Sequence, residues 1–306
     1  MRILLTNDDG IRAPGIVALH HALLGLDDHH DTPISGTDTE ILTIAPETVQ
    51  SATSHGVTFD EPLMAKPTIV NEHMRGVAVD GRPADCVKIA LSCIWPERYG
   101  EGARPDLVVS GMNSGANCGI NVIYSGTVAA ALEASFLGLP SIAVSMHLGR
   151  GKPLFDVAAR HARKAIELIL KAGLIQPGTC MNINVPRTEV PWGPDEIGNK
   201  APPAVRQVDD PPPESIDPYA DPPIRVCAMN THGLIDEYER RTNPNGDVYY
   251  WASGGGLNFY NCDDDTDVQH LFRRCTTITP LHHDLTRTPV LEKWADAIDG
   301  RRTGKN

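Results

Sequence analysis

Short runs rich in apolar residues alternate with helical patterns through the first 186 residues of the chain. The runs predict buried strands at residues 3–5, 41–44, 107–109, 142–144 and 181–185. Between them, apolar residues recur at helical spacing in segments 14–24, 83–94, 128–137 and 157–172. Short buried strands that alternate with helices are typical of βαβ units. We therefore expect an α/β fold in which helices cover both faces of a mostly parallel sheet.

The pattern changes in the C-terminal part of the chain. Residues 186–223 carry eleven prolines and few apolar runs, which predicts an extended arm. The turn sequence Asn243-Pro-Asn-Gly246 precedes the aromatic run 248–251, and this order predicts a turn that leads into a strand. Residues 276–280 predict a final strand.

These patterns divide the chain into two parts. A chain of 306 residues with 41% hydrophobic and 22% charged residues can bury a substantial core. We expect residues 1–186 to form that core. We expect residues 187–306 to form a proline-rich arm, a hairpin and a C-terminal segment that returns to the core.

Charge and cysteine usage narrow the range of partners. The net charge of −12 makes a nucleic-acid polymer an unexpected partner, because an acidic surface repels phosphate backbones. A small phosphorylated substrate remains compatible, since a bound cation reverses the local charge. The sequence shows no secretory signal, no apolar run near the ~20 residues of a membrane span, and no C-x-x-C pair among seven cysteines. We expect a cytoplasmic protein with free thiols and no membrane partner.

Two adjacent aspartates, Asp8 and Asp9, directly follow the first predicted strand. Their mutual repulsion is relieved by a hard divalent cation such as Mg²⁺ or Mn²⁺, which prefers carboxylate oxygens. Gly10 lets the backbone turn sharply behind them. A helix N-cap is the competing interpretation, because Asp is favoured at the positive end of a helix.

Two further polar loops follow predicted strands and are expected at the same sheet edge, where such sheets bind ligands. In the loop at residues 46–55, Ser51 can complete a metal shell or bind phosphate, and an ordinary Ser/Thr turn is the alternative. His55 is either a general acid or a structural hydrogen-bonding residue. The Gly- and Asn-rich loop at residues 110–121 offers backbone N–H groups for phosphate and Asn carbonyl oxygens for a cation, or is a flexible connection.

Residues 124–127 begin the next helix, and a helix start with free amides and hydroxyls predicts an anion site. Neither a Walker A loop nor the dinucleotide-binding G-x-G-x-x-G is present. A serine hydrolase is disfavoured, because the chain has no Gly-x-Ser-x-Gly motif. The residues predicted to bind phosphate or substrate are Asn7, Ser51, Ser110, Gly111, Gly115, Asn117, Ser125, Gly126 and Thr127.

Three other polar clusters are not interpreted as sites. Asp28-His-His-Asp31 lies in a polar insertion, residues 27–39, that predicts a solvated surface loop. The acidic run 263–267 lacks the spacing of an EF-hand. His282 and His283 have no partner that the sequence identifies.

Taken together, these motifs resemble the SurE family, the survival-protein-E 5′/3′-nucleotidases. The resemblance is specific over most of residues 1–186 and looser across the proline-rich arm. The matching stretches are LLTNDDG (4–10), IAPETVQSATSHGVT (44–58), VDGRPADCVKIAL (79–91), PDLVVSGMNSGANCGINVIYSGTVAAALEA (105–134), LPSIAVS (139–145) and NINVP (182–186), with weaker matches at 248–251 and 276–281.

The resemblance implies a Rossmann-like catalytic core and one divalent cation per subunit, Mg²⁺ or Mn²⁺, held by Asp8, Asp9, Ser51 and Asn113. It implies that Asp8, Asp9 and Asn113 are catalytic in the hydrolysis of nucleoside 5′- and 3′-monophosphates. Asp8 either orients a water molecule or attacks phosphorus itself. A polyphosphatase or phosphodiesterase on the same metal site, or a phospho-ligand sensor without turnover, remains the alternative. The resemblance also implies a homodimer or homotetramer in which C-terminal arms or hairpins are exchanged.

Three departures from the family pattern bear on substrate preference and assembly. Arg82 stands where the family usually has a small residue, so it either adds a cation near the substrate or faces solvent. The insertion at residues 27–39 is long, and the proline-rich stretch 202–223 lengthens the predicted arm. None of the three involves the predicted metal ligands.

Overall fold

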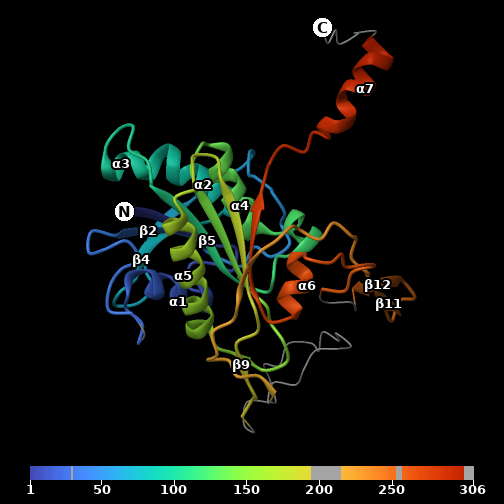
Figure 1. Ribbon diagram of the computed structural model, residues 1–306, viewed down its shortest axis with the longest axis horizontal. Coiled ribbons are helices and arrows are strands. Elements are labelled where there is room, and N and C mark those ends of the chain that lie inside the picture. The colour runs from blue at the N-terminus through green and yellow to red at the C-terminus, as the bar shows by residue number, and fades with distance from the viewer. Residues whose placement is uncertain (29, 194–214, 253–256, 300–306) are drawn as a thin grey trace.

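The computed structural model describes residues 1–28, 30–193, 215–252 and 257–299. Nine strands form one sheet in the order β10-β13-β8-β6-β5-β1-β2-β4-β3 (Figure 1). Pairing is parallel from β8 through to β4, and it is antiparallel where β13 meets β8 and where β3 meets β4. The strands are β1 (Arg2–Thr6), β2 (Glu40–Pro46), β3 (Ala65–Ile69), β4 (Arg75–Val79), β5 (Leu107–Ser114), β6 (Ser141–Met146), β8 (Cys180–Val185), β10 (Ile224–Val226) and β13 (Thr276–Leu281).

Helices cover both faces of this sheet, as predicted. Along β1, Ile3 and Leu5 enter the core that α1 and α5 cover, whereas Leu4 enters the core on the opposite face, under α2 and α4. Because both faces are buried, the strands are continuously apolar instead of alternating. The helices of the body are α1 (Pro14–Leu24), α2 (Pro83–Ile89), α3 (Trp95–Tyr99), α4 (Gly126–Phe136), α5 (Phe155–Ala172) and α6 (Asp267–Phe272).

Two predicted boundaries are wrong. The helix predicted at residues 83–94 continues through a π-helical turn, Ala90–Ile94, into α3. The loop predicted from residue 110 begins only after Ser114, because β5 resumes its pairing with β6 beyond a register shift between Ser110 and Asn113. The strand therefore extends to Ser114 and carries Asn113 to the carboxyl edge of the sheet.

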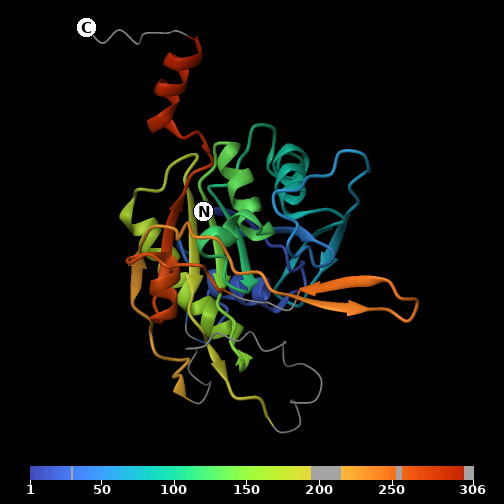
Figure 2. The same cartoon turned by 90° about the vertical axis from the view of Figure 1, so that its right-hand side faces the viewer.

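Part of the C-terminal region completes the sheet. Strands β13 and β10 add two strands beyond β8. The predicted hairpin is present as β11 (Tyr238–Thr242) and β12 (Val248–Ala252), and it projects from the body (Figure 2). Helix α7 (Thr288–Asp299) also projects away from the sheet (Figures 1 and 2).

Two short strands, β7 (Lys152–Pro153) and β9 (Glu189–Val190), pair outside the main sheet. Residues 194–214, which include much of the predicted proline-rich arm, lie outside the described residues. Among the residues that the structure describes, no helix is both long enough and apolar enough to cross a membrane.

Candidate functional site

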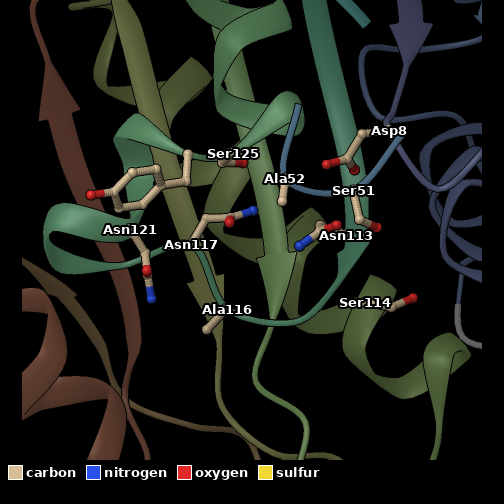
Figure 3. Close-up of a pocket in the computed structure, with 10 residues that line it drawn as sticks. Asp8, Ser51, Ala52, Asn113, Ser114, Ala116, Asn117, Asn121 and Ser125 are labelled. Atoms are coloured by element: carbon tan, nitrogen blue, oxygen red, sulfur yellow. The ribbon is translucent and has the colours of Figure 1, made fainter. Parts of the chain in front are cut away.

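A pocket of about 240 Å³ opens at the carboxyl edge of the sheet, between the loops that follow β1, β2 and β5. Figure 3 shows Asp8, Ser51 and Asn113 together on one side of it and Asn121 on the opposite side. Five predicted site residues therefore meet here. The lining residues are Asp8, Ser51, Ala52, Asn113, Ser114, Ala116, Asn117, Asn121, Tyr124 and Ser125.

Asp8 is the buried carboxylate of this pocket, with 4% of its surface exposed. The Thr127 hydroxyl donates to its Oδ1, and the Thr127 amide donates to its Oδ2 at 3.1 Å. Desolvation by burial raises the pKa of Asp8 from 3.8 to about 6, and the neighbouring charge of Asp9 adds to this, while the bonds from Thr127 act against it. A carboxylate this costly to ionise is one that a bound cation would stabilise strongly.

The start of α4 is built to approach Asp8 closely. Ser125 caps the helix, because its hydroxyl oxygen accepts a hydrogen bond from the Val128 amide at 3.0 Å. A Cβ atom at Gly126 would lie 3.0 Å from the Asp8 Cβ atom, so the absent side chain leaves room for the contact. Gly126 and Thr127 were predicted to bind phosphate. The structure places both against Asp8 and outside the pocket lining.

Asp9 lies beside the pocket and does not line it. Its Oδ2 accepts a hydrogen bond from the Ser114 amide at 2.8 Å, which joins the loop after β1 to the end of β5. The Gln50 amide donates to the Asp8 carbonyl oxygen at 2.7 Å, so the loop that carries Ser51 is joined to the same segment. These two hydrogen bonds hold the three strand ends in a fixed relation.

The loop that carries Ser51 is also held from its far side. Thr58 donates through both its amide and its hydroxyl to the buried carboxylate of Asp85, at 2.9 and 2.8 Å. His55 contacts Glu133 on α4 through a 2.8 Å hydrogen bond, and Lys88 on α2 donates to the same carboxylate at 3.0 Å. His55 therefore has a structural partner away from the pocket, in keeping with the second of its two interpretations.

Glu133→Gln is expected to destabilise the protein at pH 7 by about 1 kcal/mol, a modest value because Lys88 is half-exposed. Burial opposes ionisation of Glu133, but the bonds from His55 and Lys88 outweigh it and hold its pKa below 4.5. A lowered pKa contributes stability above pH 4.5 that is lost as the pH falls through the lowered value. Urea unfolding should therefore show that the difference in unfolding free energy between the wild type and Glu133→Gln becomes smaller in acid. Glu97→Gln, at an exposed position on α3, is the matched control, and an equal loss for both variants would contradict the assignment.

The predicted metal ligands form an all-oxygen donor set, which suits Mg²⁺ or Mn²⁺. The Asn113 amide nitrogen donates to the Gly115 carbonyl oxygen at 2.7 Å. That bond fixes the side chain and leaves its carbonyl oxygen without a hydrogen-bond partner among the described residues. Together with the buried, hard-to-ionise Asp8, this available oxygen fits a hard cation. The ligand set of Asp8, Asp9, Ser51 and Asn113 stays a prediction.

Three amides of the predicted phosphate loop donate hydrogen bonds within the protein. The Gly115 amide donates to the Met146 carbonyl oxygen, and the Asn117 amide donates to the Asn184 side chain. The Gly119 amide donates to Asp267. These three amides have partners within the protein, and the prediction that this loop holds phosphate stays a prediction. Asn117 still lines the pocket, although its side-chain amide donates to the Ser145 hydroxyl at 2.8 Å.

Three other predicted residues are not part of the pocket lining. Asn7 is fully buried, and its side-chain nitrogen donates to the Gly10 carbonyl oxygen at 2.9 Å. Ser110 is also fully buried, and Gly111 follows it within β5. None of the three lines the pocket, and for Ser110 and Gly111 the reason is that β5 continues past them to its edge.

The sequence interpretation missed Asn121 and Tyr124 as pocket residues and Thr127 as the partner of Asp8. The signal for the first two was their place in a polar loop that leads to a helix start.

The discounted clusters stay outside this site: His30 is paired with Asp27, and the described residues contain no group of three His, Cys, Asp or Glu side chains placed to hold a metal. Arg82 is exposed, and its guanidinium donates to the Val57 carbonyl oxygen at 3.3 Å.

Known proteins are similar to this chain along most of its length. The family model of Survival protein SurE matches residues 3–200. The chain is 38% identical over 297 residues to the 5′-nucleotidase SurE of Syntrophobacter fumaroxidans, a match that covers 96% of this chain and 99% of that protein. It is 39% identical over 308 residues to the 5′-nucleotidase SurE of Carboxydothermus hydrogenoformans, with 98% of each chain covered.

The fold is also similar to that of a SurE protein of known structure. The crystal structure of the SurE protein from Aquifex aeolicus superposes with a TM-score of 0.68 and 28% identity, and the match covers 97% of this chain and 99% of that one. A family match over most of the core, relatives above 30% identity along nearly the full chain and a shared fold lead to one conclusion: this chain belongs to the SurE family.

Proposed function

We propose that this protein is a divalent-metal-dependent phosphomonoesterase that hydrolyses nucleoside 5′-monophosphates, and also 3′-monophosphates, to nucleoside and phosphate. The observation that carries the proposal is the buried Asp8 carboxylate, which lines one small pocket together with the side chains of Ser51 and Asn113. Relatives that match nearly the full length of the chain bear the name 5′-nucleotidase, which supports the same reaction.

We propose that Asp8, Asp9, Ser51 and Asn113 hold one Mg²⁺ or Mn²⁺ ion per subunit. When bound, the cation supplies positive charge that draws in the phosphate group and lowers the pKa of a coordinated water. Thr127 holds both oxygens of Asp8 and so fixes the orientation of its carboxylate. The bond from Asn113 to Gly115 does the same for the Asn113 carbonyl oxygen. Such preorganisation is the main contribution a protein makes to phosphoryl transfer.

The shape of the pocket supports a nucleoside monophosphate over a bare phosphate. The phosphate group belongs beside Asp8, Ser51 and Asn113, which are on one side of the pocket, and Asn121 lies on the opposite side (Figure 3). Asn121 offers amide hydrogen bonds, and Tyr124, which also lines the pocket, offers an aromatic ring that is 56% exposed. These are groups that a nucleoside can contact by hydrogen bonding and stacking.

We also propose that the protein acts in the cytoplasm as a homodimer or homotetramer, and that residues 187–306 contribute to the contacts between subunits. Exposed apolar side chains support this. Tyr250 and Trp251 on the hairpin are 64% and 61% exposed, and Trp294 and Ile298 on α7 are 64% and 73% exposed. Large exposed apolar groups on projecting elements are typical of surfaces that a second copy covers.

A substrate panel tests the proposed reaction. With Mg²⁺ or Mn²⁺ present, we expect phosphate release from nucleoside 5′- and 3′-monophosphates and much slower release from a phosphodiester and from polyphosphate. Colorimetric detection of phosphate measures all of them in one format. Preferred hydrolysis of the diester or of polyphosphate would assign the site to the corresponding alternative, and absence of turnover with every monoester would refute the proposal.

A further inference from the structure

The buried carboxylate of Asp267 lies outside the pocket and contacts no residue of the predicted metal site. It is fully buried at the start of α6, in the acidic run that sequence analysis set aside. Three backbone amides donate to it: Gly119 to Oδ2 at 2.8 Å, and Asn230 and Val268 to Oδ1 at 2.9 and 2.8 Å. A buried carboxylate with three N–H donors forms strong, directional bonds.

The bond to Gly119 joins α6 to the segment that lines the pocket. Residues 117–124 have two faces. Asn117, Asn121 and Tyr124 line the pocket, whereas Cys118 packs with Leu257, Val268 and Leu271 on the other side. Gly119 lies on this second side, and it begins the 3₁₀ turn Gly119–Ile123 that carries Asn121 to the pocket.

Close packing at Gly119 leaves little freedom for this segment. A Cβ atom at Gly119 would lie 2.8 Å from the Phe259 ring and 3.1 Å from Val268 Cγ2. Its φ of 57° is in the left-handed region, so glycine is favoured here on both counts. Toward the N-terminus, Asn117 is held by β6 and β8, and at the C-terminal end the Tyr124 carbonyl oxygen accepts from the Ser54 amide. Between these two fixed points in the chain, Asp267 accepts the hydrogen bond from the Gly119 amide.

We propose that Asp267 is a positioning residue that sets the place of Asn121 and Tyr124 and thereby the affinity for the nucleoside part of the substrate. The inference rests on the proposed function and deepens it, because it assigns a role at the nucleoside end of the pocket to a residue of the C-terminal region. The metal end is held by separate contacts, at Thr127 and Gly115. Asp267 should therefore affect nucleoside binding and leave chemistry at phosphorus largely unchanged.

Asp267→Asn is the direct test. If the Asn oxygen keeps the bonds from Asn230 and Val268, its NH₂ group faces the Gly119 N–H, and two donors oppose each other. We expect KM for a nucleoside 5′-monophosphate to rise about tenfold with kcat changed less than about twofold. With β-glycerophosphate, which has no nucleoside, kcat/KM should stay within about twofold of the wild type. Asp264→Asn removes an exposed charge from the same run and should change neither.

The outcomes separate the inference from the function on which it rests. The positioning role is wrong if the wild type releases phosphate and Asp267→Asn lowers kcat/KM by the same factor for both substrates. It is also wrong if the variant changes kcat/KM for neither substrate. If the wild type releases none, the proposed function fails. Amide hydrogen exchange then tests whether Asp267 holds this segment, because loss of its bond with the Gly119 amide should speed exchange in residues 118–124. If Asp267→Asn does not fold, Val268→Ala, which removes the packing against Gly119, should give the same selective rise in KM.

Discussion

Asp8→Asn is expected to abolish phosphate release and, at the same time, to stabilise the metal-free protein at pH 7. Activity should fall on the order of 10³-fold or more, because the buried charge that holds the cation is lost. The stability change has the opposite sign. A folded-state pKa raised from 3.8 to about 6 favours the folded state below pH 3.8, and this contribution is lost as the pH rises through 6.

Ionisation of Asp8 at pH 7 lowers the free energy of unfolding by about 3 kcal/mol, and a neutral Asn avoids this cost. Asn also retains the bonds to Thr127, because its oxygen can accept from the amide while its nitrogen donates to the hydroxyl oxygen. Thermal unfolding in EDTA measures the effect, with the exposed Asp60→Asn as the matched control. A lower Tm for Asp8→Asn in EDTA, or activity within tenfold of the wild type, would show that Asp8 is not a buried cation ligand.

Gly15→Ala is expected to destabilise the fold by about 3 kcal/mol or more. Gly15 is on the first turn of α1, and a Cβ atom there would lie 2.1 Å from the Met112 carbonyl oxygen in β5. Both partners are backbone, so α1 must move away from the sheet. Met112 directly precedes Asn113, so the same shift should also weaken metal-dependent activity in the fraction that folds.

Chemical denaturation measures the loss of stability, and phosphate release at a temperature where the variant is folded measures the second effect. Gly233→Ala is the matched control, because a Cβ atom there meets only the Tyr260 ring at 3.6 Å, an ordinary contact. An unfolding free energy equal to that of the wild type would mean that α1 does not pack against β5 as closely as the structure shows.

The sequence predicted the layers of the fold because its strongest signals are local. Runs such as Ile3-Leu4-Leu5 are apolar at every position only where both faces of a strand are buried, and this pattern identifies parallel strands without any knowledge of their order. Strand β3 was missed for the same reason. It is an edge strand with mostly exposed residues and a proline, so it carries no apolar pattern.

The site was predictable in part. Asp8 and Ser51 follow two strands of the sheet and Asn113 lies at the end of a third, so chain order alone brings them to one edge. The partners that hold them depend on packing between distant segments. Thr127 is 119 residues from Asp8, and Asp267 is 148 residues from Gly119, so nothing in the local sequence marks either contact. The partners of the loop amides at positions 115, 117 and 119 could not be predicted for a related reason, since they come from β6, β8 and α6.

Restoring a divalent cation to the chelated protein tests the central claim most directly. After EDTA treatment and dialysis, phosphate release from a nucleoside 5′-monophosphate should be undetectable. It should return on addition of Mg²⁺ or Mn²⁺, saturating at one ion per subunit by parallel calorimetric titration. Asp9→Ala should show neither the binding nor the return of activity. Hydrolysis that persists undiminished in EDTA, or that survives in Asp9→Ala, would contradict a catalytic cation held at this edge of the sheet.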